Sequence, residues 1–126
     1  RALLMEYEKA WNRHDVEGIA AYFSDDFTFE DLPMGMTANS KEDFVKILKK
    51  TFSEVPNFSM RIEQIHEGDN FVVTEWMQAG TASGEIQGGE LSLKPYRVKT
   101  TSVIEFHENK IVRLSDNWDA STFYKP

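Results

Sequence analysis

The second half of the chain, beginning directly after Pro56, is built almost entirely of strand-like segments. These segments span residues 58–67, 71–80, 96–107 and 111–119. The turns Gly68-Asp69-Asn70 and Glu108-Asn109-Lys110 join them in pairs, which is typical of antiparallel hairpins. Consecutive hairpins bury one face of a sheet, so the first half of the chain must supply a cover for that face.

The first half of the chain reads as helices with one short strand at residues 27–31. Its apolar residues recur at three- and four-residue steps, which predicts helices over residues 2–13, 15–23 and 40–53. Asp15 and Ser40 stand where helix caps are expected. We therefore expect an α+β fold, in which three helices close the concave side of a cone-shaped, curved antiparallel sheet formed by residues 58–119.

The composition of the chain limits the partners that it can bind and the part of the cell in which we expect it. The 40% of apolar residues can build one core, and we expect one domain over residues 1–126. The net charge of −7 disfavours nucleic acid and anionic membranes as partners. The longest apolar run, residues 19–23, is too short to span a bilayer, and the chain has no cysteine for a disulfide or a thiol nucleophile. The expected location is cytoplasmic.

The last strand carries the most informative polar residue. One of its faces is expected to hold Val112, Leu114, Asp116 and Trp118. Asp116 is then the single carboxylate on an apolar face, and such a group is usually partnered, protonated or functional. The alternative is a strand-end aspartate tied to a backbone amide or to Arg97.

Asp31 repeats this pattern, because it is in phase with Phe27 and Phe29. Taken alone, the better interpretation is that Asp31 starts the turn before Pro33. On the first helix, Tyr7 and Trp11 lie one turn apart on the face that meets the sheet, where most aromatic residues are plain core.

The middle strands also direct polar side chains towards an aromatic interior, as a small-molecule pocket requires. If Glu75 faces solvent, the inward sets are Val72, Thr74, Trp76 and Gln78 on one strand and Thr100, Ser102, Ile104 and Phe106 on the next. The residues we expect to bind a substrate are Trp11, Phe29, Phe44, Met60, Trp76, Gln78, Ser102 and Trp118. The glycine-rich stretch from Gly80 to Pro95 is predicted to be either extended strand ends or a mobile flap near a ligand.

No cofactor or metal is expected. The three histidines, His14, His66 and His107, lack the spacing of a metal site. The chain also has no glycine-rich phosphate loop and no serine elbow.

The order of these elements, with the segment YFSDDFTFED at residues 22–31, resembles the nuclear-transport-factor-2-like superfamily. Several short motifs are most similar to its SnoaL-like polyketide cyclase branch: Val55-Pro56-Asn57-Phe58, Glu67-Gly68-Asp69, Gly80-Thr81 with Gly84-Glu85, and Asn109-Lys110-Ile111-Val112. The resemblance covers nearly the whole chain and implies the same cone-shaped fold. The superfamily includes enzymes and non-catalytic binders, so the fold alone does not decide the function.

The resemblance implies roles for three residues. Steroid isomerases place a general-base aspartate where this chain has Asp31 and an oxyanion-binding tyrosine where it has Tyr7. Their second, protonated aspartate falls at Ser102, which cannot act in the same way, and an extra Leu32 precedes the turn. SnoaL-like cyclases and limonene epoxide hydrolases carry an acid/base aspartate that Asp116 matches.

The resemblance to the epoxide hydrolases is incomplete. Their arginine and second aspartate fall at Trp76 and Gln78, which argues against epoxide opening by that mechanism. Gln78 is the only evident residue that could hold a water for Asp116 to activate.

These observations lead to one hypothesis with two alternatives. The first is a cofactor-free isomerase, cyclase or lyase that moves a proton on an apolar cyclic or polyketide-type carbonyl compound. Asp116 would be its acid/base, Tyr7 the oxyanion donor and Asp31 a second base or proton shuttle. The alternatives are a non-catalytic domain of the same fold, for apolar ligands or for dimerisation, and a water-activating hydrolase.

We also expect a homodimer. The other face of the sheet would carry Val73, Met77, Val103 and Ile65, which is more apolar surface than a monomer normally exposes.

Overall fold

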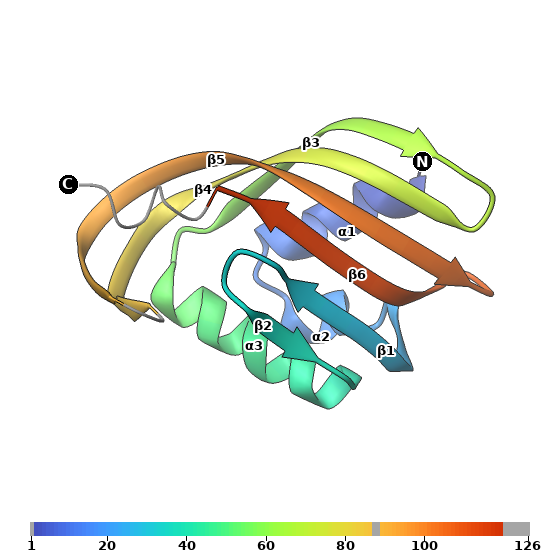
Figure 1. Cartoon of the computed structure of the whole chain (residues 1–126), viewed down its shortest axis with the longest axis horizontal. Helices are drawn as coiled ribbons and strands as arrows, with labels where there is room; N and C mark the ends of the chain where they lie inside the picture. Colours follow the sequence, from blue (N-terminus) through green and yellow to red (C-terminus); the bar gives the residue numbers. More distant parts are fainter. Residues whose placement is uncertain (1, 87–88, 120–126) are drawn as a thin grey trace.

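The computed structural model describes residues 2–86 and 89–119. Their elements, in chain order, are α1 (Ala2–Asn12), α2 (Val16–Ala20), β1 (Phe23–Asp31), β2 (Met36–Ala38), α3 (Lys41–Glu54), β3 (Ser59–Glu67), β4 (Phe71–Ile86), β5 (Gly89–His107) and β6 (Lys110–Trp118). The six strands form one curved sheet, and the three helices cover one of its faces (Figure 1). Strands β4 and β5 form the long arch of this sheet.

The sheet is mixed rather than wholly antiparallel. Its strand order is β2-β1-β6-β5-β4-β3. Strands β3 to β6 are antiparallel neighbours, as predicted for residues 58–119, but β1 lies parallel to β6. The chain between β1 and β6 includes α3 and the strands β2 to β5, and a connection of that length permits the parallel pairing that a hairpin cannot make.

The three predicted helices form with shifted ends. The side chain of Asp15 accepts a hydrogen bond from the backbone of Gly18 at 3.0 Å, and Ser40 accepts one from Asp43 at 3.1 Å, so both predicted caps are confirmed. Helix α2 ends at Ala20 rather than at residue 23, because the fully buried Phe23 starts β1. Strand β2, beyond the turn that follows Asp31, was not expected from the sequence.

Two β-bulges change which residues face the helices. In β6, Val112 is an extra residue opposite β5, so the fully buried Ile111 takes the inward position predicted for Val112. In β3, the extra residue is Glu63, and beyond it Ile65 turns towards the core. The prediction that Ile65 lies on the outer face is therefore wrong.

The inward sets predicted for the middle strands are confirmed where the pairing is regular. Thr74, Trp76 and Gln78 of β4 are buried, as are Thr100 and Ser102 of β5. Between Gly80 and Pro95 the two strands continue as a paired ladder, which matches the expectation of extended strand ends, although residues 87 and 88 lie outside the described part. Within the described residues no helix is long and apolar enough to cross a membrane.

Candidate active site

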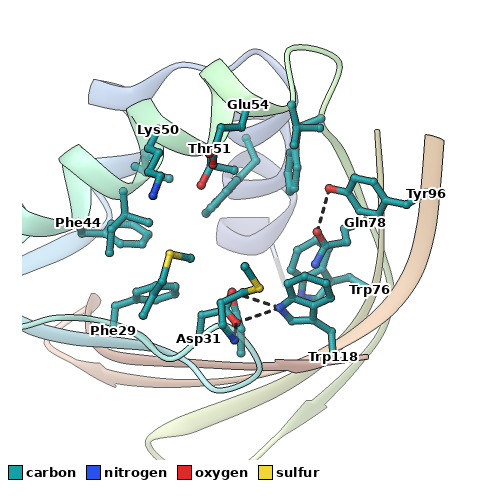
Figure 2. A pocket seen from close by; sticks show the side chains of 18 residues that line it. Phe29, Asp31, Phe44, Lys50, Thr51, Glu54, Trp76, Gln78, Tyr96 and Trp118 are labelled. Atoms are coloured by element: carbon teal, nitrogen blue, oxygen red, sulfur yellow. Dashed lines mark hydrogen bonds between the residues drawn. The ribbon is translucent and has the colours of Figure 1, made fainter. Parts of the chain in front are cut away.

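A pocket lies between α3 and the curved sheet, with about 820 Å³ of open space that includes its solvent mouth. Aromatic and aliphatic side chains make most of its wall, and carboxylates stand among them. Figure 2 shows Lys50, Thr51 and Glu54 of α3 across the pocket from Asp31 and Trp118. The described lining residues are Trp11, Phe29, Asp31, Met34, Met36, Phe44, Ile47, Leu48, Lys50, Thr51, Glu54, Val55, Phe58, Trp76, Gln78, Tyr96, Asp116 and Trp118.

Asp116 reaches the pocket from β6, because the strand returns to the predicted alternation after its bulge. The hydroxyl of Ser102 donates a hydrogen bond to Asp116 Oδ1 at 2.6 Å. Burial raises the pKa of Asp116 to about 7, the hydrogen bond from Ser102 opposes this rise, and the nearby Asp31 carboxylate adds to it. Ser102, and not Arg97, is thus the side chain that partners Asp116 among the described residues.

Asp31 stands directly beside Asp116, since the two are register partners in the parallel pair β1–β6. The indole Nε1 of Trp118 donates to both carboxylate oxygens of Asp31 at 3.1 Å (Figure 2). The backbone N–H of Met34 donates to Oδ1 at 3.3 Å, so Asp31 starts a turn and also lines the pocket. Burial raises the pKa of Asp31, and the bonds from Trp118 and Met34 hold the rise back.

Ser102 lies behind Asp116 rather than in the described pocket wall. Its hydroxyl oxygen accepts a hydrogen bond from the indole Nε1 of Trp76 at 2.7 Å while the hydroxyl donates to Asp116. Trp76 does line the pocket. Ser102, which we expected to contact a substrate, is therefore not a described lining residue. It instead links Trp76 to Asp116 through two hydrogen bonds.

The amide of Gln78 is held from both ends. Its Nε2 donates to Thr100 Oγ1 at 3.0 Å, and the Tyr96 hydroxyl donates to its Oε1 at 3.1 Å (Figure 2). Burial raises the pKa of Tyr96. Gln78 is therefore a fixed polar group on the pocket wall.

Tyr7 is packed in the core, 3% exposed, and is not among the described lining residues. Its ring meets those of Trp11, Tyr22 and Phe23. Burial raises the pKa of the Tyr7 phenol, the Asp116 carboxylate raises it further, and the Trp11 indole opposes the rise. This interaction connects Tyr7 electrostatically with Asp116 but does not bring its hydroxyl to the pocket wall.

Of the remaining residues predicted to bind a substrate, some line the pocket and one does not. Trp11, Phe29 and Phe44 line the pocket, whereas Met60 is buried in the core outside the described lining. The backbone N–H of Met60 instead donates to Asn12 Oδ1 at 2.7 Å.

Three titratable residues of the described pocket lining were not predicted from the sequence: Lys50 and Glu54 of α3, and Tyr96 of β5. Lys50 and Glu54 stand one helical turn apart, a spacing that indicates a shared polar face, whereas the apolar stripe of this helix predicts only its core-facing residues. Burial raises the pKa of Glu54, and the neighbouring Lys50 lowers it. Tyr96 is the first residue of the predicted strand 96–107 and lies in β5, but strand periodicity did not predict that it lines the pocket.

The histidines lie away from the pocket lining. His66 Nε2 is 2.9 Å from Glu75 Oε2, and His14 stacks on Phe52. Among the described residues, no group of three or more histidine or acidic side chains is placed to hold a metal ion.

The pair of carboxylates gives the pocket its chemistry. Asp31 accepts from two donors that favour its charged form, the Trp118 indole N–H shared between both oxygens and the Met34 backbone N–H, whereas the one described donor to the Asp116 carboxylate is the Ser102 hydroxyl. Environments that separate two neighbouring carboxyl groups in this way assign different acid/base roles to them. Asp116 can exchange a proton near neutral pH, in a wall that is otherwise mostly apolar.

Comparison with known proteins agrees with this architecture. The family model described as SnoaL-like polyketide cyclase matches residues 1–125. No curated protein is a significant match to the sequence.

Solved structures share the fold at low sequence identity. A protein from Shewanella denitrificans OS-217, proposed to be a SnoaL-like polyketide cyclase, superposes with a TM-score of 0.83 at 20% identity, covering 98% of this chain and 92% of that one. A Catenulispora acidiphila protein with a ketosteroid isomerase-like fold, in complex with trimethylamine, gives 0.82 at 18% identity, with 95% and 87% covered. An epoxide hydrolase from M. tuberculosis, similar to limonene epoxide hydrolase, gives 0.74 at 16% identity, with 96% and 83% covered.

Proposed function

Because the chain belongs to the SnoaL-like polyketide cyclase family, we propose that it is an acid/base enzyme for a small, apolar carbonyl compound of cyclic or polyketide type. The reaction would be a cyclisation, an isomerisation or an elimination that starts with proton removal next to the carbonyl group. Asp116 is its proton carrier. The proposal includes no cofactor.

The single observation that carries this proposal is the environment of Asp116. Its carboxyl group lines an aromatic pocket, has a pKa of about 7 and stands beside a second carboxylate. A general base works best when its pKa lies near the working pH, because it is then both available and strong enough. Exposed aspartates, with pKa values of about 4, are much weaker bases.

The proposed step conserves atoms and charge. The ionised Asp116 takes a proton from the carbon next to the carbonyl group, and the electron pair of the broken C–H bond moves onto the carbonyl oxygen. The enolate then either regains the proton at another carbon, expels a leaving group or attacks a second carbonyl group to close a ring. The protonated Asp116 gives its proton to the departing group in the elimination and to the new alkoxide in the ring closure, so it is ionised again at the end of each route.

The developing enolate oxygen needs a hydrogen-bond donor. Tyr7 is our candidate, supported by its electrostatic interaction with Asp116 and by the match to the isomerase tyrosine. Its hydroxyl would have to reach the substrate past Trp11. Trp11, Trp76 and Trp118 would offer flat surfaces to a planar ring system.

A proton-exchange screen tests the proposed function without knowledge of the substrate. Cyclic ketones, β-diketones and β-keto esters are incubated with the protein in D₂O, and NMR follows the loss of the signal from the activated C–H. We expect exchange above the buffer rate for some members of this panel, and loss of that excess in the Asp116→Asn variant. An excess that persists in the variant would contradict the assignment of Asp116.

The pH dependence of that exchange is a direct prediction. A base must be ionised to act, so kcat/KM should rise with pH and reach half of its plateau near pH 7, where Asp116 loses its proton. Asp31 from β1 and Tyr7 from α1 interact electrostatically with Asp116, and the other titratable side chains that line the pocket are Lys50 and Glu54 from α3 and Tyr96 from β5. A profile that is flat between pH 5 and 9, or that falls through this range, would contradict Asp116 as the base.

A non-catalytic ligand-binding domain is the second candidate. It is favoured by the hydrogen bond from Ser102, which gives Asp116 the structural partner that a binder would need. The two functions differ in the exchange experiment, because a binder would show ligand-induced NMR shifts of pocket residues without proton exchange. A water-activating hydrolase is a third possibility, in which the fixed amide of Gln78 would hold the water.

We also propose that the protein forms a homodimer through the sheet face opposite the helices. Val73, Met77 and Val103 are partly buried and stand on that face. Light scattering at about 50 µM should report twice the chain mass, because specific interfaces commonly have micromolar or lower dissociation constants. Replacing Val103 with Glu should return a monomer, whereas a parent protein that is monomeric at this concentration would overturn the proposal.

A further inference from the structure

Two buried side chains, Trp76 and Ser102, form a chain of hydrogen bonds that ends on the partly buried carboxylate of Asp116. Trp76 Nε1 lies 2.7 Å from Ser102 Oγ, and Ser102 Oγ lies 2.6 Å from Asp116 Oδ1. Trp76 is 4% exposed and Ser102 3% exposed, so neither is free to exchange its partner for bulk water. An indole N–H can donate but never accept.

This asymmetry fixes the hydroxyl group of Ser102. Because its oxygen accepts from Trp76, its hydrogen is directed to the remaining neighbour, Asp116 Oδ1. A carboxylate oxygen that accepts such a bond is a poor place for the proton of the neutral acid. The second oxygen, Oδ2, has no hydrogen-bond partner among the described residues. Because Asp116 lines the pocket, this oxygen is the one left to interact with a substrate.

We propose that Trp76 is a positioning residue: through Ser102 it fixes Oδ1 of Asp116 as an acceptor, so that the proton of this carboxyl group resides on Oδ2, the oxygen left for the pocket. The inference deepens the proposed function, on which it rests for the substrate that receives the proton. It also gives Ser102 a task different from substrate contact. Asp116 and Asp31 then each depend on an indole, Trp76 acting through Ser102 and Trp118 acting directly.

The two indoles have opposite expected effects on Asp116. Loss of the Trp76–Ser102 chain removes a donor that stabilises the Asp116 carboxylate. Loss of the Trp118 bonds makes Asp31 easier to protonate, which weakens the negative charge beside Asp116. Variants of the two tryptophans therefore form a matched pair.

The test is an NMR titration of the carboxyl carbon of Asp116 in ¹³C-labelled protein, without substrate. Ser102→Ala should raise the pKa of Asp116 by about 1 to 2, the usual strength of a hydrogen bond to a charged group. Trp76→Phe should raise it by a smaller amount, because the serine hydroxyl keeps its hydrogen but loses its fixed direction. Ser102→Thr, which keeps the hydroxyl, should restore the parent value, and Trp118→Phe should leave the pKa of Asp116 unchanged or lower.

The proposal is overturned if Trp76→Phe leaves the pKa of Asp116 unchanged, or if Trp118→Phe raises it as much as Trp76→Phe does. The parent protein provides a measurement that needs no variant, should one fail to fold. There, the indole N–H resonance of Trp76 should titrate together with the Asp116 carboxyl group, and an indole signal that ignores this titration would also overturn the proposal. Since no substrate is present, a failed exchange screen would count against the proposed function alone.

Discussion

Replacing Asp116 with Asn is expected to lower the turnover of an exchanging substrate by about 10²–10⁴-fold, the usual contribution of a general base. Asn has nearly the same shape and can still accept the hydrogen bond from Ser102, but it cannot take up a proton. The measurement is the rate of proton exchange at saturating substrate. Asp119→Asn is the matched control, because Asp119 is an exposed residue beyond the end of β6 and is not among the described lining residues. A variant with the parent rate would remove Asp116 from the mechanism.

The same variant should fold, and above neutral pH it should be more stable than the parent protein. The pKa of Asp116 is about 7 in the folded chain and near 3.8 when unfolded, so between these values the folded state binds more protons than the unfolded one. The parent's stability therefore declines as pH rises from about 4 to about 7, and the Asn variant lacks this decline. Urea unfolding at pH 5 and pH 8 would show the parent losing stability relative to the variant, and the reverse order would contradict the buried acid.

Replacing Phe44 with Ala should destabilise the fold by about 3–5 kcal/mol, the usual cost of truncating a fully buried aromatic residue. Phe44 is 0% exposed and lies at the centre of an aromatic cluster that spans α1, α3 and β1. Its ring centroid lies 4.8–6.5 Å from those of Trp11, Phe23, Phe27 and Phe29. Since domains of this size are commonly stable by only about 5–15 kcal/mol, the loss should be plain in urea unfolding.

Phe71→Ala provides the control for aromatic content, because Phe71 is 45% exposed at the start of β4. It should lose much less stability than Phe44→Ala. Equal losses in the two variants would show that the cluster around Phe44 is not what holds α3 to the sheet.

Local alternation predicted much of the fold, and it also placed the central acid of the site. The inward positions of Thr74, Trp76 and Gln78 follow from strand parity alone, and the same rule places Asp116 on the face of Leu114. These positions lie in regular ladders, where one side-chain period applies without interruption.

Strand alternation could not predict where the β-ladders are interrupted by bulges. A bulge adds one residue to one strand of a pair, and nothing in the residue types around Val112 or Glu63 distinguishes it from regular strand. The parallel pairing that sets Asp31 beside Asp116 joins distant parts of the chain, so no local pattern reports it. The direction of the Ser102 hydroxyl depends in turn on Trp76, a neighbour on another strand.

Strand β6 lies between β1 and β5 in the sheet, although it follows every other described element along the chain. During synthesis, the edges of β1 and β5 that pair with β6 therefore stay unpaired until β6 has been made and joins the sheet. Contacts so distant in sequence form slowly, and exposed edges can meanwhile pair with other chains. Because β6 carries both Asp116 and Trp118, a chain in which this strand has not yet paired with β1 has neither the proton carrier nor the indole that holds Asp31 in place, so the acid pair forms only when β6 joins the sheet.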